Sequence, residues 1–339
     1  GMGHGSGLGK ARIPEITYWE GFGSPAMKYN RYTKYSPPVS EIGLGAWQLG
    51  VNSGWRGMSE KQAIQMVHKS MEHGINFFDT APNYGLGTSE IRLGKALKGV
   101  DRSKIVINAK FGHTVHGDTN FAADYIRESI EGSLRRLQMD YVDSAIMHNP
   151  PFEYLNGDHN PHFDILEQLR EEGKIRAYGA SLDTYEEMKC LMETTGSEVI
   201  EAFFNILHQD ASRAFKMAKT KGVGIIVKIP LDSGWLTGKY HAGSVFEDIR
   251  ARWSAEDIKV RAALVEQVRS KIGKERNLAQ AAIAFCLAYP EVSTVIPGNT
   301  SLEQLESNVR STRDPLPAAM VKELEAFYRQ EVMDRNLPW

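Results

Sequence analysis

Cysteine is scarce in this chain of 339 residues, because only Cys190 and Cys286 occur. Both lie in apolar stretches with helical spacing, which indicates buried thiols. One long-range disulfide between them is compatible with the pattern, but a chain of this length buries enough surface to fold without it. Low cysteine content is typical of a reducing cytoplasm, so we expect a cytoplasmic protein.

Long apolar runs and an excess of one charge are also missing. No run of about 18 apolar residues exists, and the opening GMGHGSGLGKARIPE lacks the apolar core of a signal peptide. With 40 basic and 42 acidic residues, the formal net charge is -2. The chain therefore offers no basic footprint for nucleic acid and no polybasic patch for an anionic membrane. We expect neither nucleic acid nor a membrane among its partners.

What the sequence does contain is a regular alternation of short apolar runs and longer amphipathic runs, beginning near Glu41. Segments 59–74 and 122–138 show the apolar spacing of helices. Glycines that follow such helices and precede a strand are placed as C-caps, namely Gly74, Gly99, Gly173 and Gly222. The predicted strands are 42–48, 76–80, 105–110, 142–148, 176–181, 199–205, 224–229 and 292–296.

Strict alternation of strands and helices predicts parallel strands joined by right-handed crossovers. Eight repeats favour an α/β fold closed into a (β/α)8 TIM barrel. The alternative is an open doubly wound sheet, which usually carries a Gly-rich phosphate loop after its first strand. Gly43-Leu44-Gly45 lies inside the first predicted strand and does not supply one.

We expect residues 27–339 to form a single barrel domain, preceded by a tail over residues 1–26. The region 27–42, around Pro37-Pro38, predicts an N-terminal hairpin or turn. Residues 231–258 form a long excursion after the seventh strand, and residues 317–333 form an extra C-terminal helix.

Four proton-handling side chains fall where three successive strands end. The second predicted strand ends at Asp79, with Tyr84 five residues later, and the third and fourth end at Lys110 and His148. Barrel enzymes carry their chemistry at this end of the strands. A metal site would need two or three converging His and carboxylate ligands, and the second and third strands offer no His. We therefore expect no metal.

Each of these residues alone is usually structural: an Asp caps a turn, a Lys reaches solvent, a His packs. Their convergence gives them a chemical meaning. Asp79 and Lys110 should pair, because neither charge is tolerated alone in an apolar rim. The Lys110 ammonium should then lower the pKa of Tyr84, so that the phenol can give a proton to a carbonyl oxygen near neutral pH. His148 could donate a hydrogen bond to the same oxygen.

Several segments resemble the aldo-keto reductase superfamily over about residues 27–330. FFDTAPNYG (77–85), INAKFG (107–112) and SAIMHNP (144–150) are similar to its catalytic segments. IGLGAWQLG (42–50) and WLTGKY (235–240) resemble its first strand and a loop, and IPGNTSLEQLESNV (296–309) resembles its cofactor-phosphate segment. The resemblance implies a nicotinamide-dependent reductase of aldehydes or ketones, or the reverse reaction in which the alcohol is oxidised. It makes Tyr84 the general acid, tuned by Asp79 and Lys110, with His148 orienting the substrate.

The cofactor implied by the resemblance is NADP, with NAD as the alternative. Four positions depart from the family pattern. Leu182 replaces an Asn and Glu201 a Gln, while Lys228 replaces a stacking aromatic and Gln304 an Arg for the 2′-phosphate. The expected cofactor-binding residues are Trp47, Ser181, Glu201, Lys228, Pro230, Leu231, Gly234, Leu236, Lys239, Gly298, Asn299, Ser301, Gln304 and Asn308.

A small carbonyl compound is the expected partner, and residues on or just after strand ends are candidates for its pocket: Trp47, Trp55, Phe111 and Trp235. A monomer is the expected state, as is common in the superfamily. His159 and His162 have no third ligand nearby in sequence. Because potassium-channel β subunits share the superfamily's fold and bind nicotinamide, a cofactor-binding regulatory subunit is the alternative function.

Overall fold

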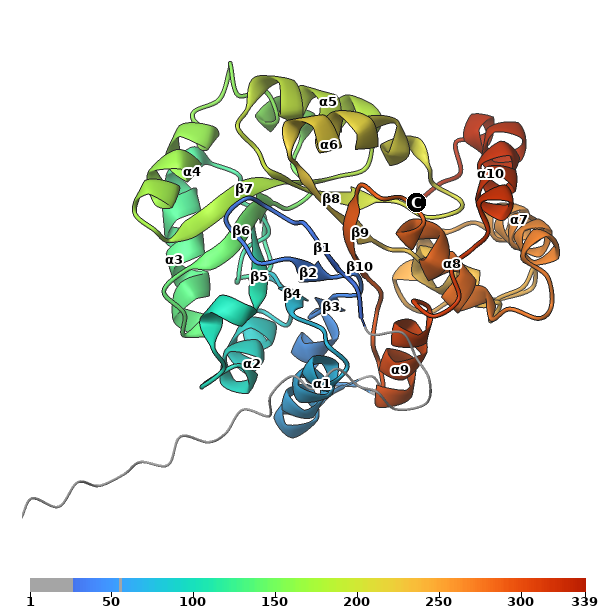
Figure 1. The fold of residues 1–339 in the computed structure, drawn as a ribbon, viewed down its shortest axis with the longest axis horizontal. Helices are drawn as coiled ribbons and strands as arrows, with labels where there is room; N and C mark the ends of the chain where they lie inside the picture. Colours follow the sequence, from blue (N-terminus) through green and yellow to red (C-terminus); the bar gives the residue numbers. More distant parts are fainter. Residues whose placement is uncertain (1–26, 55–56) are drawn as a thin grey trace, which may run out of the picture.

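The computed structural model describes residues 27–54 and 57–339, and the expected N-terminal tail and Trp55 lie outside them. Eight parallel strands are hydrogen-bonded in consecutive order, which confirms the predicted strand–helix repeat (Figure 1). The strands are β3 (Leu44–Gly45), β4 (Phe77–Asp79), β5 (Val106–Phe111), β6 (Val142–Met147), β7 (Ile175–Leu182), β8 (Val199–Phe203), β9 (Gly224–Lys228) and β10 (Val292–Ile296).

The first and last strands meet and close the sheet into a barrel. Ile42 forms a parallel bridge with Val295. The Gly43 amide donates to the Val295 carbonyl at 2.9 Å, and the Val295 amide donates to the Glu41 carbonyl at 2.9 Å. This closure rules out the open doubly wound sheet. The first strand is shorter than predicted, because the chain turns into a 3-10 helix at Gln48–Gly50.

Helices surround the barrel, and two of them lie outside the regular repeat. α7 is part of the excursion after β9, which is therefore longer than the predicted 231–258, and α10 is the predicted C-terminal helix (Figure 1). α7 and α10 pack against each other. The helices are α1 (Glu60–Glu72), α2 (Thr88–Ala96), α3 (Ile126–Leu137), α4 (His162–Glu171), α5 (Tyr185–Thr194), α6 (Phe215–Lys221), α7 (Ala255–Ile272), α8 (Leu278–Leu287), α9 (Leu302–Arg310) and α10 (Ala318–Phe327).

The predicted N-terminal hairpin is present and covers one end of the barrel. Its strands β1 (Tyr29–Asn30) and β2 (Val39–Ser40) are antiparallel, and the hairpin crosses the barrel end that faces the viewer in Figure 1. The side chain of Tyr32, in the turn of the hairpin, is fully buried among inward-facing strand residues such as Phe77 and Val106. The hairpin is thus the floor of the barrel.

Side chains alternate between the inside of the barrel and the helical layer, as strand geometry requires. On β5, Val106 packs in the inner cluster, whereas Ile107 and Ala109 pack in the outer cluster against the helices. Lys110 has the same parity as Val106, and Asp79 has the same parity as Phe77. The alternation therefore directs both polar side chains into the barrel at the end opposite the floor.

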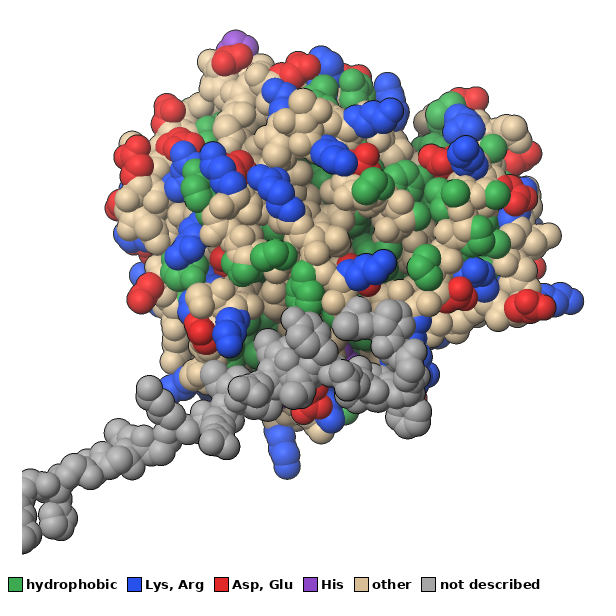
Figure 2. Space-filling view, viewed as in Figure 1, with side chains coloured by type: hydrophobic (Ala, Val, Ile, Leu, Met, Phe, Trp, Pro, Cys, Tyr) green, Lys and Arg blue, Asp and Glu red, His purple; other side chains and the backbone are tan. Residues whose placement is uncertain are grey.

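The face of the molecule seen in Figure 2 carries no dominant charge. Acidic and basic side chains are interspersed over the face seen in Figure 2, in keeping with the net charge of -2. Within residues 27–54 and 57–339, no helix combines the length and apolarity needed to cross a membrane.

Candidate active site

The buried Asp79 and Lys110 form one hydrogen-bonded group with the partly buried Tyr84 at the open end of the barrel. The Lys110 ammonium donates to Asp79 Oδ1 at 2.5 Å and to the Tyr84 hydroxyl at 2.9 Å. The Asp79 and Lys110 side chains are 2% and 0% exposed. Such burial is tolerable for two opposite charges that are paired and hydrogen-bonded. The ion pair predicted from the sequence is therefore present.

The loop that carries Tyr84 is fixed by a close backbone approach. Gly85 has φ +63°, and a Cβ atom there would lie 2.1 Å from the Gly50 carbonyl oxygen. Only glycine fits this contact without moving one of the two loops. The Tyr84 carbonyl also accepts a hydrogen bond from the Ser89 amide in α2 at 3.1 Å. The position of the phenol is thus set by the first two βα loops together.

His148, just after β6, faces Tyr84 with a ring-centroid distance of 6.1 Å and an interplanar angle of 88°. Burial and the positive charge of Lys110 hold the pKa of His148 well below its usual range. The imidazole is therefore neutral near pH 7 and has one N–H to donate. Its Nδ1 atom is buried without a hydrogen-bond partner.

A second imidazole, which the sequence analysis did not identify, lies beside it. The ring of His113 is 4.7 Å from that of His148, and burial lowers the pKa of His113. His113 follows β5 by two residues, in a loop where neither strand parity nor helical spacing applies.

The pKa of Tyr84 corrects one expectation. Burial of the phenol raises its pKa to about 12, even though the nearby Lys110 ammonium lowers it. The negative charges of Asp79 and Glu201 also raise it. The expectation that Lys110 would bring the pKa toward neutrality was wrong, because desolvation outweighs the ammonium. The phenol is therefore fully protonated at neutral pH.

Glu201 adds a second carboxyl group to the site. It lies on β8 with its side chain 3% exposed, and its Oε2 is 3.7 Å from the Lys110 ammonium. Burial and the neighbouring Asp79 raise the pKa of Glu201 well above its usual range. Its Oε1 atom is buried without a hydrogen-bond partner. A neutral carboxyl in this place has capacity for one more polar contact.

Comparison with known proteins identifies the family. The family model described as the aldo/keto reductase family matches residues 41–329. The chain belongs to the aldo/keto reductase family. It is 30% identical to the L-galactose dehydrogenase of Arabidopsis thaliana over 312 residues, covering 89% of this chain and 93% of that protein.

A probable voltage-gated potassium channel subunit β of the same plant is 30% identical over 317 residues, covering 86% and 92%. The solved holo form of an aldo-keto reductase from Bacillus halodurans has a TM-score of 0.75 and 28% identity, with 89% and 96% coverage. The chain is thus an oxidoreductase with the (β/α)8 fold of its family.

In this aldo/keto reductase, the rim opposite Tyr84 is held together by Ser181, Asn149 and Lys228. The Ser181 hydroxyl accepts a hydrogen bond from the backbone N–H of Asn149 at 2.8 Å. The Lys228 ammonium donates to the side-chain oxygen of Asn149 at 2.7 Å. Leu182, in the place of the family's Asn, is buried in the outer layer. Asn149, which the sequence analysis did not identify, brings a side-chain amide to this rim from the loop after β6.

The segment after β10 forms the N-terminus of α9. Ser301 caps the helix, its hydroxyl accepting from the Gln304 amide at 3.1 Å. The Gln304 side-chain oxygen accepts from the Thr300 hydroxyl at 2.9 Å. Asn308 donates to the Gly298 carbonyl at 3.0 Å and to Asn299 Oδ1 at 2.8 Å. The five residues predicted here therefore lie together, with Gln304 engaged in capping.

The start of the excursion has an unusual backbone. Ile229, Asp232 and Ser233 have φ of +59°, +54° and +55°, values that cost energy for residues other than glycine. Asp232 is fully buried and forms an ion pair with Arg261 of α7. His208 Nε2 lies 3.2 Å from Asp232 Oδ1. These contacts fix the turn that carries Pro230, Leu231, Gly234 and Leu236, while Lys239 is exposed farther along.

The predicted substrate residues lie in different environments. Trp47 follows β3 at the open end and is 54% exposed. Phe111 faces the helical layer, and Trp235 is fully buried against Tyr240 and Trp253 in the excursion. The orientation of Phe111 and Trp235 speaks against direct substrate contact, and Trp55 lies outside the described residues.

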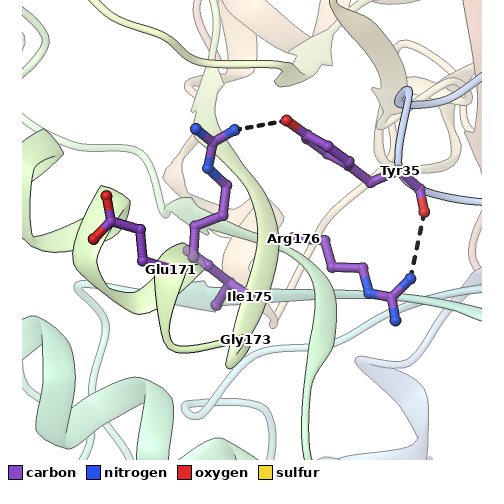
Figure 3. Close-up of a pocket in the computed structure, with 6 residues that line it drawn as sticks. Tyr35, Glu171, Gly173, Ile175 and Arg176 are labelled. Carbon is purple, nitrogen blue, oxygen red and sulfur yellow. Dashed lines mark hydrogen bonds between the residues drawn. The ribbon is translucent and has the colours of Figure 1, made fainter.

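A pocket of about 450 Å³ lies far from this site, near the floor of the barrel (Figure 3). Arg170 donates to the Tyr35 hydroxyl at 3.1 Å there, and Arg176 lines the same pocket. Within the described residues, no group of three or more His, Cys, Asp or Glu side chains is placed to hold a metal ion. The His162 ring is hydrogen-bonded to the Phe121 carbonyl at 2.6 Å.

Proposed function

We propose that this aldo/keto reductase reduces an aldehyde or ketone with a nicotinamide cofactor, and oxidises the alcohol in reverse, with Tyr84 as the general acid. The observation that carries the proposal is a protonated phenol held at 2.9 Å by the Lys110 ammonium, facing a neutral imidazole. A substrate oxygen between Tyr84 and His148 would meet a proton donor and a hydrogen-bond donor together.

The proton moves from the Tyr84 hydroxyl to the carbonyl oxygen as that oxygen gains charge. The phenolate left behind is stabilised by the Lys110 ammonium, which Asp79 keeps in place at 2.5 Å. The N–H of His148 orients the oxygen toward Tyr84. Water is excluded from the ion pair, because both of its side chains are buried.

The rim offers partners for a nicotinamide. The unpartnered buried Glu201 Oε1, with the Ser181 hydroxyl on the neighbouring strand, fits a carboxamide. The N-terminus of α9 and the turn after β9 suit a phosphate group, since backbone amides are available at a helix start. When bound, the reduced nicotinamide would supply the hydride that the carbonyl carbon accepts.

The residues near α9 favour NADH over the NADP implied by the resemblance. Residues 298–309 contain Glu303 and Glu306 but no Lys or Arg. Gln304, in the place of the family's arginine, uses its side-chain oxygen to accept from Thr300, the residue before the helix cap. A 2′-phosphate would therefore meet acidic rather than basic neighbours in this segment.

A regulatory subunit is the second candidate, favoured by the similarity to a probable potassium channel subunit β. It would bind cofactor without steady turnover. The protonated phenol of Tyr84 and the neutral His148 favour an active enzyme.

The test compares wild type with Tyr84→Phe, using Tyr35→Phe as a matched control because Tyr35 lies at the opposite end of the barrel. Turnover is measured on a panel of sugar aldehydes, aromatic aldehydes and ketones, and NADH and NADPH binding by fluorescence titration. Tyr84→Phe should lose turnover by about 100-fold or more while binding cofactor normally. Near-normal turnover of Tyr84→Phe would refute the assigned acid. Tight cofactor binding by wild type, with no turnover on any substrate, would favour the regulatory subunit.

A further inference from the structure

A column of buried polar side chains runs from the floor of the barrel to the active site. The Tyr32 hydroxyl lies 2.5 Å from Ser144 Oγ, which lies 2.7 Å from Asn108 Oδ1. Asn108 Nδ2 in turn donates to Asp79 Oδ2 at 2.8 Å. Tyr32, Ser144 and Asn108 are each fully buried. The column thus connects the hairpin with the carboxylate that holds Lys110.

The proton donors of the column all point the same way. Ser144 has a single hydroxyl proton, which it donates to Asn108 Oδ1. Its oxygen must therefore accept from the Tyr32 hydroxyl. Asn108 donates its amide N–H to Asp79 in the same direction along the column. Burial raises the pKa of Tyr32 well above its usual range, so that this donor stays protonated. Aligned hydrogen bonds strengthen one another, and here each one favours a negative charge on Asp79.

The fold itself does not require these polar groups. Their neighbours inside the barrel are apolar, including Phe77, Val106 and Ile146. Asn108 and Ser144 are partners in register on β5 and β6, a place where apolar side chains of similar size would fill the barrel. Buried polar groups are costly unless satisfied, and apolar replacements are often neutral for stability. A chain of satisfied groups that ends on the catalytic ion pair therefore suggests a role in the reaction.

The two oxygens of Asp79 show what this role would be. Oδ1 accepts from Lys110 and Oδ2 accepts from Asn108, so the carboxylate is held at both ends. Glu201 also lies within 3.7 Å of the Lys110 ammonium. Glu201 also forms a hydrogen bond with Asp79. Without the Asn108 contact, Asp79 is held by Lys110 and Glu201 alone, and its carboxylate can tilt toward Glu201. This tilt would draw the Lys110 ammonium away from the Tyr84 hydroxyl.

We propose that Asn108 is a positioning residue for the reaction, supported by Ser144 and Tyr32, and that it acts by fixing Asp79 and through it Lys110. The inference rests on the proposed function of Tyr84. It predicts a loss of catalytic rate without a loss of binding, because none of the three residues reaches the open end of the barrel.

The test is a graded series of variants, with kcat, KM and cofactor affinity measured for each. Asn108→Leu, similar in shape but apolar, should lower kcat by about 10- to 100-fold, the loss typical when a hydrogen-bond partner that orients a metal ligand is removed and taken here for a partner that orients Asp79. Ser144→Ala and Tyr32→Phe leave Asn108 in place and should lower kcat less, with Tyr32→Phe the smaller effect. KM and cofactor affinity should change by no more than about threefold in all three variants, since none of the substituted residues contacts the substrate or the cofactor.

The matched control is Thr294→Val, which removes a fully buried hydroxyl from the inner face of β10, outside the column. It should leave kcat close to that of wild type. The inference is overturned if Asn108→Leu keeps kcat within about twofold of wild type. It is also overturned if Thr294→Val lowers kcat by as large a factor as Asn108→Leu does. If Asn108→Leu fails to fold, Tyr32→Phe still decides, because it removes one oxygen atom and should lower kcat measurably. Tyr84→Phe is measured alongside: if it retains turnover, the proposed function fails, and if it alone loses turnover, only the role of Asn108 fails.

Discussion

Tyr84 should release its proton about two pH units later than an ordinary tyrosine. Burial raises its pKa to about 12, and each pKa unit corresponds to about 1.4 kcal/mol, so the phenolate is disfavoured by roughly 2.7 kcal/mol. An ultraviolet difference titration of the cofactor-free protein against Tyr84→Phe measures this directly, since the variant lacks one phenolate signal. A Tyr84 signal that titrates at or below about pH 10 would refute the reasoning.

The same shift has a consequence for stability. The unfolded chain loses this proton near pH 10, whereas the folded chain holds it to about 12. The folded state is therefore unaffected below about pH 10 and loses up to roughly 2.7 kcal/mol as the pH rises from 10 to 12. Tyr84→Phe should lose less stability than wild type over this window in denaturant unfolding. Equal losses in both proteins would contradict the burial argument.

Two further predictions concern other buried charges. Arg261→Met leaves Asp232 buried without its cation, so it should lower the free energy of unfolding by about 3–5 kcal/mol, and Asp232→Asn in the same chain should restore much of it. Urea unfolding checks this, and an unchanged midpoint for Arg261→Met would contradict it. Glu201→Gln replaces a carboxyl whose pKa burial has raised. The folded state holds that proton while the unfolded state releases it, so wild type loses stability as pH rises above about 4. The variant should therefore gain thermal stability over wild type as the pH rises above about 4, and equal melting temperatures at all pH values would contradict the raised pKa of Glu201.

The barrel was predictable because its signals are local. All eight strands follow from apolar runs. The glycines predicted as C-caps have the positive φ that this position requires, such as Gly74 at +89°. The excursion was underestimated for a non-local reason. α7 places Arg261 on its buried side, which interrupts the apolar spacing, and the charge is tolerated only because Asp232 comes from a distant turn. A sequence window cannot contain that pair.

The pairing of Asp79 with Lys110 was also predictable, since strand parity and strand ends place both side chains on one rim. The residues that were missed lie elsewhere. Asn108 is in the middle of β5 and owes its importance to a contact with Asp79 of β4, and Asn149 and His113 lie in loops. The predicted direction of the Tyr84 pKa shift was wrong for a related reason. The sequence indicates that a lysine lies near the phenol, but it does not reveal how deeply the phenol is buried.

Under the proposed function, the charge balance at the site sets how each direction of the reaction depends on pH. The Lys110 ammonium is already paired with Asp79 at 2.5 Å, and a raised pKa leaves Glu201 protonated beside them. A phenolate at Tyr84 would add a negative charge that Lys110 can only share. Tyr84 therefore gives up its proton only to a strong base, and the oxygen of a carbonyl that is gaining charge becomes one as it is reduced. Oxidation of an alcohol needs the phenolate form of Tyr84, which is scarce at neutral pH. Carbonyl reduction is therefore expected near neutral pH, and alcohol oxidation should accelerate as the pH approaches the pKa of Tyr84.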